Sequence, residues 1–218
     1  MNRELRARER SSGEADRTSS RRHPKSQQRW EQILLTATRL FSERGFAATS
    51  MQDISDHVGV KKGSLYYYVE SKEQLLFEIL RDLHHGGLAL VAGVNFLSSD
   101  PLGELRAFLV QVGIYAGKHA DRLGIYGRDF RFLDQAQQSR IIEERFMYRD
   151  SVTKLLERAI ELGTIDASLH VESAAQAILR ATATVSEWYQ PKGPLPIEQI
   201  AVQTAKLLIA GLEHYGRQ

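Results

Sequence analysis

Apolar residues recur at helical spacing along most of the chain. The first such stretch begins near Gln28 and ends before Gly45, which stands where a left-handed cap would end a helix. Its apolar positions are Ile33, Leu34, Ala37, Leu40 and Phe41. No segment alternates apolar and polar residues as a strand does. The pattern therefore predicts an all-α chain of about nine helices.

Two capping boxes mark the next helix starts. Ser50 with Asp53 opens a short helix that Gly59 ends, and Ser71 with Gln74 opens a longer one. Because their side chains accept hydrogen bonds from free backbone N–H groups, such residues favour the beginning of a helix.

Residues 61–68 are predicted to form a further short helix, with Leu65 and Val69 pointing inward. Two short helices joined across a glycine-containing turn and braced by a longer helix form a helix-turn-helix pattern. Spacing alone leaves a generic α-hairpin as the alternative.

Beyond residue 73 the pattern stays helical. A kink or interruption is expected at Gly86–Gly87, a helix start at Asp100–Pro101 and a turn at Asp121. Further helices are expected over residues 135–162, ended by Gly163, and over 171–189 and 197–215.

Composition narrows the class of protein. The chain has 218 residues, 42% of them hydrophobic, and no cysteine, which excludes disulfides, redox motifs and thiolate zinc sites. It has no apolar run near the length of a membrane span and no apolar signal core, so a cytoplasmic protein with no membrane contact is expected.

Basic residues are concentrated at the N-terminus. Residues 1–29 hold nine basic and four acidic residues, residues 30–72 hold five of each, and residues 73–218 hold 15 and 18. This distribution favours a nucleic-acid-facing start. We expect a disordered basic arm over 1–26, a helix-turn-helix domain over 27–73 and a larger helical domain over 74–218.

The arm has two interpretations. Arg17, Arg21, Arg22 and Lys25 are expected to add phosphate or minor-groove contacts, as basic arms do elsewhere. A solvated tail without contacts is the alternative.

The helix-turn-helix carries chemistry suited to DNA. Hydroxyls and free N–H groups at helix N-termini favour phosphates, lysines reach phosphates or base edges, and glycine lets the backbone approach closely. The candidate DNA-contacting residues are Thr49, Ser50, Gln52, Lys61, Lys62, Gly63, Ser64, Tyr66, Tyr67 and Lys72.

The stretch ILLTATRLFSERGFAATSMQDISDHVGVKKGSLYYYVESKEQLL resembles the DNA-binding domain of the TetR family of bacterial regulators. The resemblance implies that the third helix lies in the major groove of a double-stranded operator. Three positions depart from the family pattern. Lys61 replaces the usual capping Ser or Thr, Tyr68 stands where His is common, and Val69 replaces an aromatic residue. The first two alter the surface that reads sequence, so the operator sequence does not carry over.

The last two helices carry stripes of small and apolar residues. One stripe is Val171, Ala174, Ala175, Ile178, Ala181, Thr182 and Val185. The other is Ile197, Ile200, Ala201, Thr204, Leu207, Leu208, Gly211 and Leu212. Two such helices per subunit predict a four-helix bundle across a homodimer axis, as the TetR resemblance also implies. The alternative is that both stripes face the monomer's own core.

The TetR resemblance implies a small hydrophobic effector as a second ligand. Phe108, Tyr115, Tyr126, Phe130, Phe132 and Met147 are candidate pocket walls, with ordinary core packing as the alternative. The segment AILRATATVSEWYQPKGPLPIEQIA resembles TetR-type repressors of fatty-acid and steroid catabolism, whose effectors are CoA thioesters. That resemblance implies that Arg180 faces the ligand's polar end, with Thr184 and Trp188 on the next turns. Plain solvent exposure of Arg180 is the alternative.

These observations predict a ligand-responsive repressor that binds a palindromic operator as a dimer. A regulator of efflux or another catabolic operon with a non-CoA effector, and a DNA-binding protein without an effector, are the alternatives. An enzyme is disfavoured because nucleophile-elbow, phosphate-loop, dinucleotide and zinc-protease motifs are absent. We expect no catalytic residue, metal or cofactor, and surface positions for His84, His85, His119 and His170.

Overall fold

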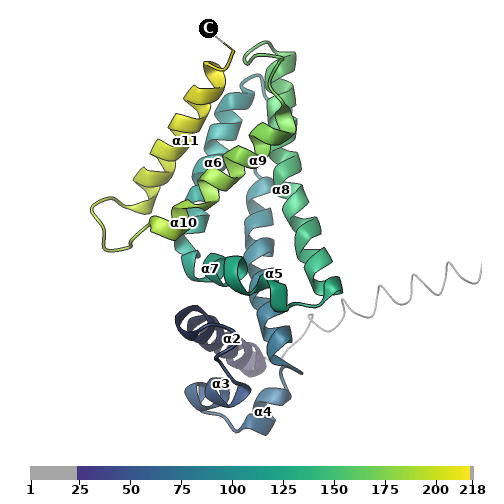
Figure 1. Cartoon of the computed structure of the whole chain (residues 1–218), viewed down its shortest axis with the longest axis vertical. Coiled ribbons are helices and arrows are strands. Elements are labelled where there is room, and N and C mark those ends of the chain that lie inside the picture. The colour runs from purple at the N-terminus through teal and green to yellow at the C-terminus, as the bar shows by residue number, and fades with distance from the viewer. Residues whose placement is uncertain (1–23, 217–218) are drawn as a thin grey trace, which may run out of the picture.

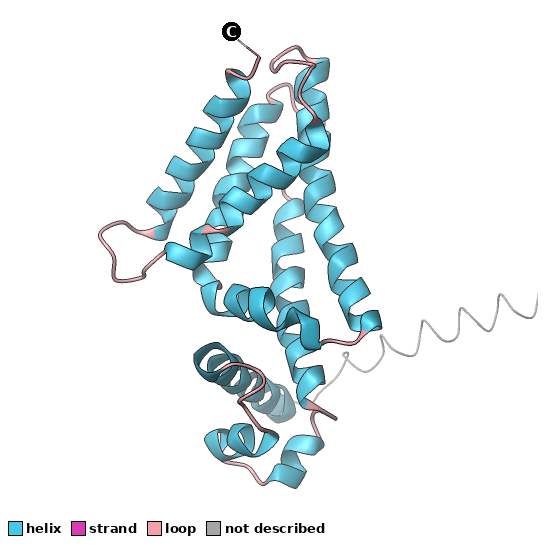
Figure 2. Ribbon diagram, viewed as in Figure 1, coloured by secondary structure: helices cyan, strands magenta, loops and turns pink. Residues whose placement is uncertain are grey.

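The computed structural model describes residues 24–216, which form ten α-helices and one 3₁₀ helix without any strand (Figure 2). The predicted all-α class is confirmed. The expected basic arm, with Arg17, Arg21 and Arg22, lies outside the described residues except for its last three positions. Those three begin the first helix at Pro24, a residue whose fixed backbone angle and missing N–H suit the first helical position.

Four helices build the lower end of the molecule in Figure 1: α2 (Pro24–Arg44), α3 (Met51–Val58), α4 (Lys62–Tyr66) and the first half of α5 (Lys72–Val91). Ser50 and Asp53 form the predicted capping box at α3. Gly59 ends α3 with φ 73°, a left-handed conformation that glycine adopts without steric cost. Ser71 caps α5 by accepting a hydrogen bond from the Gln74 N–H.

The third helix is shorter than the predicted span of residues 61–68. It runs from Lys62 to Tyr66, and its N-cap residue Lys61 makes no side-chain capping hydrogen bond. Leu65 and Val69 are both buried, as predicted, so α4 is held mainly by its inner face.

Helices α6 (Pro101–Lys118), α8 (Gln135–Glu161), α9 (Val171–Ala183) and α11 (Ile197–Glu213) stand alongside one another at the upper end (Figure 1). Helix α7 (Ala120–Asp129) and the 3₁₀ helix η1 (Phe130–Phe132) cross below them, and the short α10 (Val185–Trp188) follows α9. Within residues 24–216 no helix is long and apolar enough to cross a membrane.

Two predicted boundaries in this region were wrong. The turn expected at Asp121 lies at His119, and α7 already begins at Ala120. The helix expected over residues 171–189 divides at Thr184, where α9 ends and α10 begins. The hydroxyl of Thr184 donates to the carbonyl of Ala181 at 2.9 Å, which is the type of local bond that competes with helix continuation.

The interruption expected at Gly86–Gly87 is also absent, because α5 continues through both glycines to Val91. The glycines instead make room for two tyrosines. The Tyr115 hydroxyl on α6 donates to the Leu83 carbonyl at 2.7 Å, and the Tyr148 hydroxyl on α8 donates to the His84 carbonyl at 3.2 Å. A Cβ atom at Gly87 would lie 1.3 Å from the Tyr148 Oη atom.

Two apolar clusters lie above and below this level of α5. The lower cluster joins α2–α5 to Ile125, Leu133 and Ile141, and the upper cluster joins α6, α8, α9 and α11. Helix α5 contributes to both, since its first half is buried in the lower cluster and Leu90 and Val91 pack against the upper one. Polar side chains of α5, α6, α7 and α8 lie between the two clusters, and we call this region the polar level. It consists of His84, Tyr115, Tyr126, Glu144, Arg145 and Tyr148.

His84 belongs to this polar level, and its predicted surface position was wrong. The side chain is 8% exposed, lies against the Tyr126 ring at 5.2 Å between centroids, and leaves Nε2 without a hydrogen-bond partner. Burial, and next the nearby Arg145 guanidinium, lower the pKa of His84 to about 4 from its ordinary value of 6.5.

We expect stability to fall in mild acid because of His84. The folded pKa lies below the unfolded pKa, so its stabilising contribution is complete above pH 6.5 and is lost as the pH falls towards 4. Between pH 7 and 4.5 the free energy of unfolding should fall by about 2 kcal/mol more in the wild type than in His84→Gln. Urea unfolding at both pH values measures this difference. An equal loss in both proteins would contradict the assignment to His84.

Candidate functional site

One end of the molecule presents most of the predicted DNA-contacting residues. Lys61, Lys62, Gly63 and Ser64 are all exposed on the first turn of α4. Tyr67, at the C-cap of α4, is 84% exposed and lies edge-on to the Tyr68 ring. Tyr66 is also exposed, and α3 and α4 form the lower tip of the molecule in Figure 1.

The inward residues of α4 explain why its other side chains face out. Leu65 is fully buried and Val69 nearly so, both in the lower apolar cluster. Because neighbouring positions on a helix point about 100° apart, Ser64 and Tyr66 are turned away from the side of Leu65, whereas Lys61 and Lys62 are exposed at the start of this short helix. The arrangement offers positive charge, hydroxyls and aromatic rings on a helix narrow enough for a major groove.

The start of α3 lies beside this surface and has a different balance of charge. Ser50 is exposed, and hydrogen bonds from its side chain and backbone lower the pKa of the Asp53 carboxyl. Exposed Gln52 donates from Nε2 to the Asp56 carboxylate at 2.7 Å. The two aspartates place negative charge on α3, so the lysines of α4 supply the attraction for phosphates.

Thr49 faces inward. It is 1% exposed, and its hydroxyl donates to the Gly45 carbonyl at 2.9 Å. The side chain thus fixes the turn between α2 and α3, and only its backbone remains close to the start of α3.

Lys72 also makes its contacts within the domain. Its Nζ atom donates to the carbonyls of Phe46 and Thr49, both at 2.8 Å, and lies 4.3 Å from the centroid of the Phe46 ring. A lysine at the first position of α5 therefore ties that helix to the turn that precedes α3, and positions α3 and α4 relative to α5.

We expect Lys72→Met to destabilise the fold, whereas Lys62→Met is a matched control on the exposed surface. Removing the ammonium leaves two carbonyls without their charged donor and removes its contact with the Phe46 ring. The free energy of unfolding should fall by about 1–3 kcal/mol for Lys72→Met and by less than about 0.5 kcal/mol for Lys62→Met. Denaturant titration of both variants measures these changes. Equal effects would contradict a stabilising role for the contacts of Lys72 with Phe46 and Thr49.

The predicted effector residues fall into three separate places. Tyr126 and Phe130 pack on the lower cluster with their ring centroids 5.1 Å apart, and the Arg145 guanidinium contacts the Tyr126 hydroxyl. Phe108 is buried in the upper cluster, and Tyr115 bonds to α5 as described above.

The other predicted effector residues lie on outer surfaces. Met147 is exposed on α8. Arg180 is exposed on α9, Thr184 is half-buried at the α9–α10 junction, and Trp188 is 57% exposed. Phe132, a further candidate, is partly exposed against Phe46, with ring centroids 5.0 Å apart.

The polar level at the middle of α5 was not predicted as a site. It contains His84 with its unpaired Nε2 and Glu144 with an unpaired buried Oε2. Burial raises the pKa of the Glu144 carboxyl and of the Tyr148 hydroxyl. The adjacent glycines were the only local signal, because the tyrosines that fill the space beside them come from distant helices.

The stripes on the last two helices are divided between the core and the surface. Ala175, Ile178 and Thr182 of α9 are buried, as are Ile197, Ile200, Ala201 and Leu212 of α11. An outer face remains, which we call the α9/α11 face. It consists of Ser173, Ala177 and Ala181 on α9 and Gln203, Leu207 and Gly211 on α11, all exposed at four-residue spacing.

Comparison with known families matches both halves of the chain. A model of the tetR family of bacterial regulatory proteins matches residues 33–79, and a model of tetracyclin repressor-like C-terminal domains matches residues 98–212.

Individual proteins are similar over most of their length. The transcriptional repressor KstR2 of Rhodococcus jostii is 30% identical over 207 residues, covering 91% of this chain and 95% of that protein. The ketosteroid regulator KstR2 of Mycobacterium tuberculosis superposes with a TM-score of 0.77 at 28% identity, covering 84% and 94% of the two chains. AibR, in complex with isovaleryl coenzyme A and operator DNA, gives 0.73 at 26% identity, covering 83% and 98%.

Proposed function

Because the chain belongs to the TetR family of bacterial transcriptional regulators, we propose that it is a repressor that binds a two-fold operator as a homodimer and leaves it when an effector binds. Members of this family act through DNA binding, and the protein is not an enzyme. The main support for the proposal is the start of α4, where Lys61 and Lys62 are exposed to solvent while Leu65 is buried.

The DNA contacts are assigned by exposure. Lys61, Lys62, Ser64, Tyr66 and Tyr67 reach phosphates or base edges, and Gly63 permits close approach of the backbone. Exposed Ser50 and Gln52 approach the flanking phosphates at the start of α3. Thr49 and Lys72 hold the helices in place, and any contact they make with DNA is additional to that role.

The homodimer uses the α9/α11 face. A unit of this size reads few base pairs, so useful affinity requires two units spaced one helical turn apart on DNA, about 34 Å. Ala177, Ala181 and Gly211 have little or no side chain, which lets the helices of a second copy approach closely, and Leu207 supplies a large apolar contact.

The proposed effector is a hydrophobic molecule, with a CoA thioester as the favoured class. KstR2 of Mycobacterium tuberculosis is a ketosteroid regulator and AibR was crystallised with isovaleryl coenzyme A, and both resemble this chain over more than four fifths of its length. Exposed Arg180 and Trp188, with Thr184 between them, are available to the polar part of such a ligand. A non-CoA hydrophobic effector is the second candidate.

Helix α5 transmits the effect of the ligand. Its first half is buried among the DNA-facing helices, and its middle is held by Tyr115 and Tyr148. Helix α7 adds a second connection, because Arg128 donates to the Phe41 carbonyl of α2 at 2.5 Å. An effector that binds better when α5 and α7 are displaced shifts the population away from the DNA-binding state.

Selection of operator fragments with the purified protein, followed by salt titration, tests the DNA proposal. The selected fragments should contain a two-fold repeat, and Lys62→Ala should lower the slope of log affinity against log salt by about 1 per subunit. Lys154→Ala is the control, since this exposed lysine belongs to α8, where it pairs with Asp150, and lies on neither α3 nor α4. Equal slopes for the wild type and Lys62→Ala would remove α4 from the interface.

Calorimetry with acyl-CoA compounds beside a gel shift tests the effector proposal. We expect acyl-CoA binding and operator release over the same concentration range. Tight acyl-CoA binding without a change in operator affinity would refute release, and leave the DNA-binding assignment intact.

A further inference from the structure

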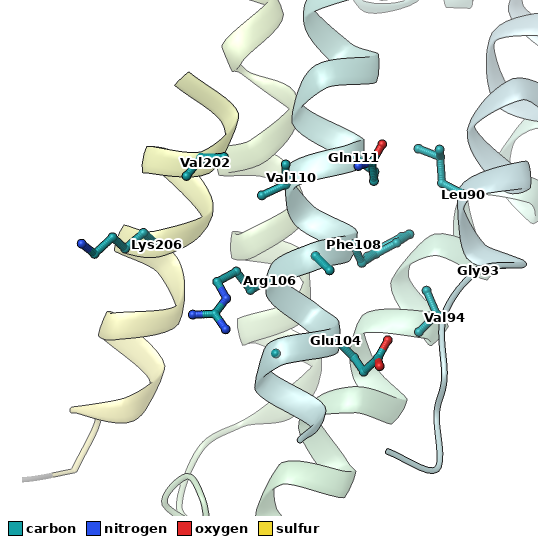
Figure 3. Close-up of a pocket in the computed structure, with 12 residues that line it drawn as sticks. Leu90, Gly93, Val94, Glu104, Arg106, Phe108, Val110, Gln111, Val202 and Lys206 are labelled. Carbon is teal, nitrogen blue, oxygen red and sulfur yellow. The ribbon is translucent and has the colours of Figure 1, made fainter. Parts of the chain in front are cut away.

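A groove of about 740 Å³ crosses the outer face of α6, between α11 and the C-terminal end of α5 (Figure 3). It lies apart from the polar level at the middle of α5, and none of Arg180, Thr184 and Trp188 lines it. Its volume falls within the range of about 300–1,000 Å³ that is usual for small-molecule sites.

Small and apolar groups form the floor of the groove. Gly103, Ala107 and Val110 line the groove and share one side of α6 by their spacing of four and three positions, and Val202 lines it from α11 near Val110 (Figure 3). Position 103 leaves no room for a side chain, because a Cβ atom there would lie 2.1 Å from the Asp100 carboxylate that caps α6. The floor therefore exposes apolar surface to water without a large side chain to cover it.

Two cations stand on the α11 side of the groove. Arg106 extends from α6 towards α11, and Lys206 lies on α11 one turn beyond Val202 (Figure 3). Neither makes an ion pair with a carboxylate in the described part of the chain, residues 24–216. The carboxylate that lines the groove, Glu104, lies on the opposite side of α6 and accepts from the Asn95 N–H at 3.4 Å.

We propose that this groove binds an amphipathic anion. Its apolar chain or ring lies over Ala107, Val110 and Val202, and its negative group is held by Arg106 and Lys206. The apolar floor supplies burial, and the unpaired cations match the ligand's charge. A fatty carboxylate and the phosphates of an acyl-CoA share this chemistry.

A second copy of the chain is a less suitable occupant. Val202 and Lys206 lie on one flank of α11, whereas Leu207 and Gly211 of the α9/α11 face lie on another. An arginine and a lysine that meet their own symmetry mates across a two-fold axis would repel one another. The cations therefore favour a small anion over self-association through the groove.

Calorimetry on the full chain with decanoate, decanoyl-CoA, free CoA and uncharged decanol tests the proposal. Decanoate or decanoyl-CoA should bind the wild type, and the double variant Arg106→Gln/Lys206→Gln should bind at least about 10-fold more weakly. Lys118→Gln is the matched control, because Lys118 joins the same two helices by a 3.9 Å ion pair with Glu198 outside the groove. Its affinity should change less than about twofold.

The ligand panel distinguishes the two sources of negative charge. Binding of decanoate without decanoyl-CoA assigns the groove to free carboxylates, and tighter binding of decanoyl-CoA than of either decanoate or CoA assigns it to thioesters. Equal affinity for decanol, unchanged affinity in the double variant, or no binding to the wild type would each overturn the proposal. A change of sedimentation mass in the double variant would overturn it in favour of a second copy.

A gel shift on the same variants separates this inference from the proposed effector mechanism. Loss of anion binding in the double variant would support anion binding in the groove. If the ligand also leaves operator affinity unchanged in every protein, ligand-induced release of the operator is refuted. Operator release accompanied by unchanged ligand affinity in the double variant supports release and overturns the groove.

Discussion

Leu207→Glu is expected to convert the protein to a monomer and to weaken operator binding about 100-fold or more. Leu207 is 75% exposed in the isolated subunit and lies at the centre of the α9/α11 face. In the proposed homodimer this side chain would be buried together with that of the second copy, and two carboxylates placed there would be desolvated without partners. Loss of the second DNA-reading unit then removes half of the operator contacts.

Val202→Glu is the matched control for this prediction. Val202 is also exposed, on the flank of the same helix that lines the groove. It should leave the sedimentation mass and operator affinity unchanged, and circular dichroism should show both variants folded. A dimeric Leu207→Glu protein would contradict the α9/α11 face as the interface, and a monomeric Val202→Glu protein would move the interface to the groove side.

The second large effect is expected at Gly87. Alanine there places a Cβ atom 1.3 Å from the Tyr148 Oη atom and 2.5 Å from its Cζ atom, so the whole ring must move. Overpacking of this kind costs about 1–3 kcal/mol or more, and loss of the Tyr148 hydrogen bond to α5 adds to it. Higher helix propensity offsets about 1 kcal/mol. The free energy of unfolding should still fall by at least about 2 kcal/mol, as denaturant titration will measure.

Two comparisons make the prediction specific to the tyrosine contact. At Gly86 an added Cβ overlaps only the hydroxyl end of Tyr115, with the Oη atom at 2.5 Å and Cζ at 3.3 Å, so Gly86→Ala should cost less. In a Tyr148→Ala background the overlap is gone, and Gly87→Ala should become neutral or stabilising by up to about 1 kcal/mol. An additive double variant would show that Gly87 is needed for another reason.

Whether α5 bends or stays rigid matters for signalling. Tyr115 and Tyr148 are hydrogen-bonded to carbonyls near the middle of α5, so in the proposed mechanism α5 moves together with α3 and α4 when a ligand displaces α6 or α8. The two glycines are the points at which these tyrosines contact α5.

The candidate DNA-contacting surface was largely predictable from the sequence. Which of its side chains are exposed and which are held by contacts within the domain was not. Tyr67 is exposed because it lies two positions after Leu65, and Lys61 and Lys62 are exposed because they stand at the start of the short α4, and both are local properties. Thr49 is buried because its hydroxyl bonds to the turn before it. Lys72 is drawn inward by carbonyls that lie 26 and 23 positions earlier.

The sequence alone determined the helical class, most helix boundaries and the helix-turn-helix, because capping boxes, left-handed glycines and apolar periodicity act within a few residues. Tertiary structure alone decided which polar groups are buried, how the small-residue stripes divide between core and surface, and where the groove lies. These features depend on contacts between distant segments. Tyr148 reaches the carbonyl of His84 across 64 positions, and no local pattern encodes that meeting.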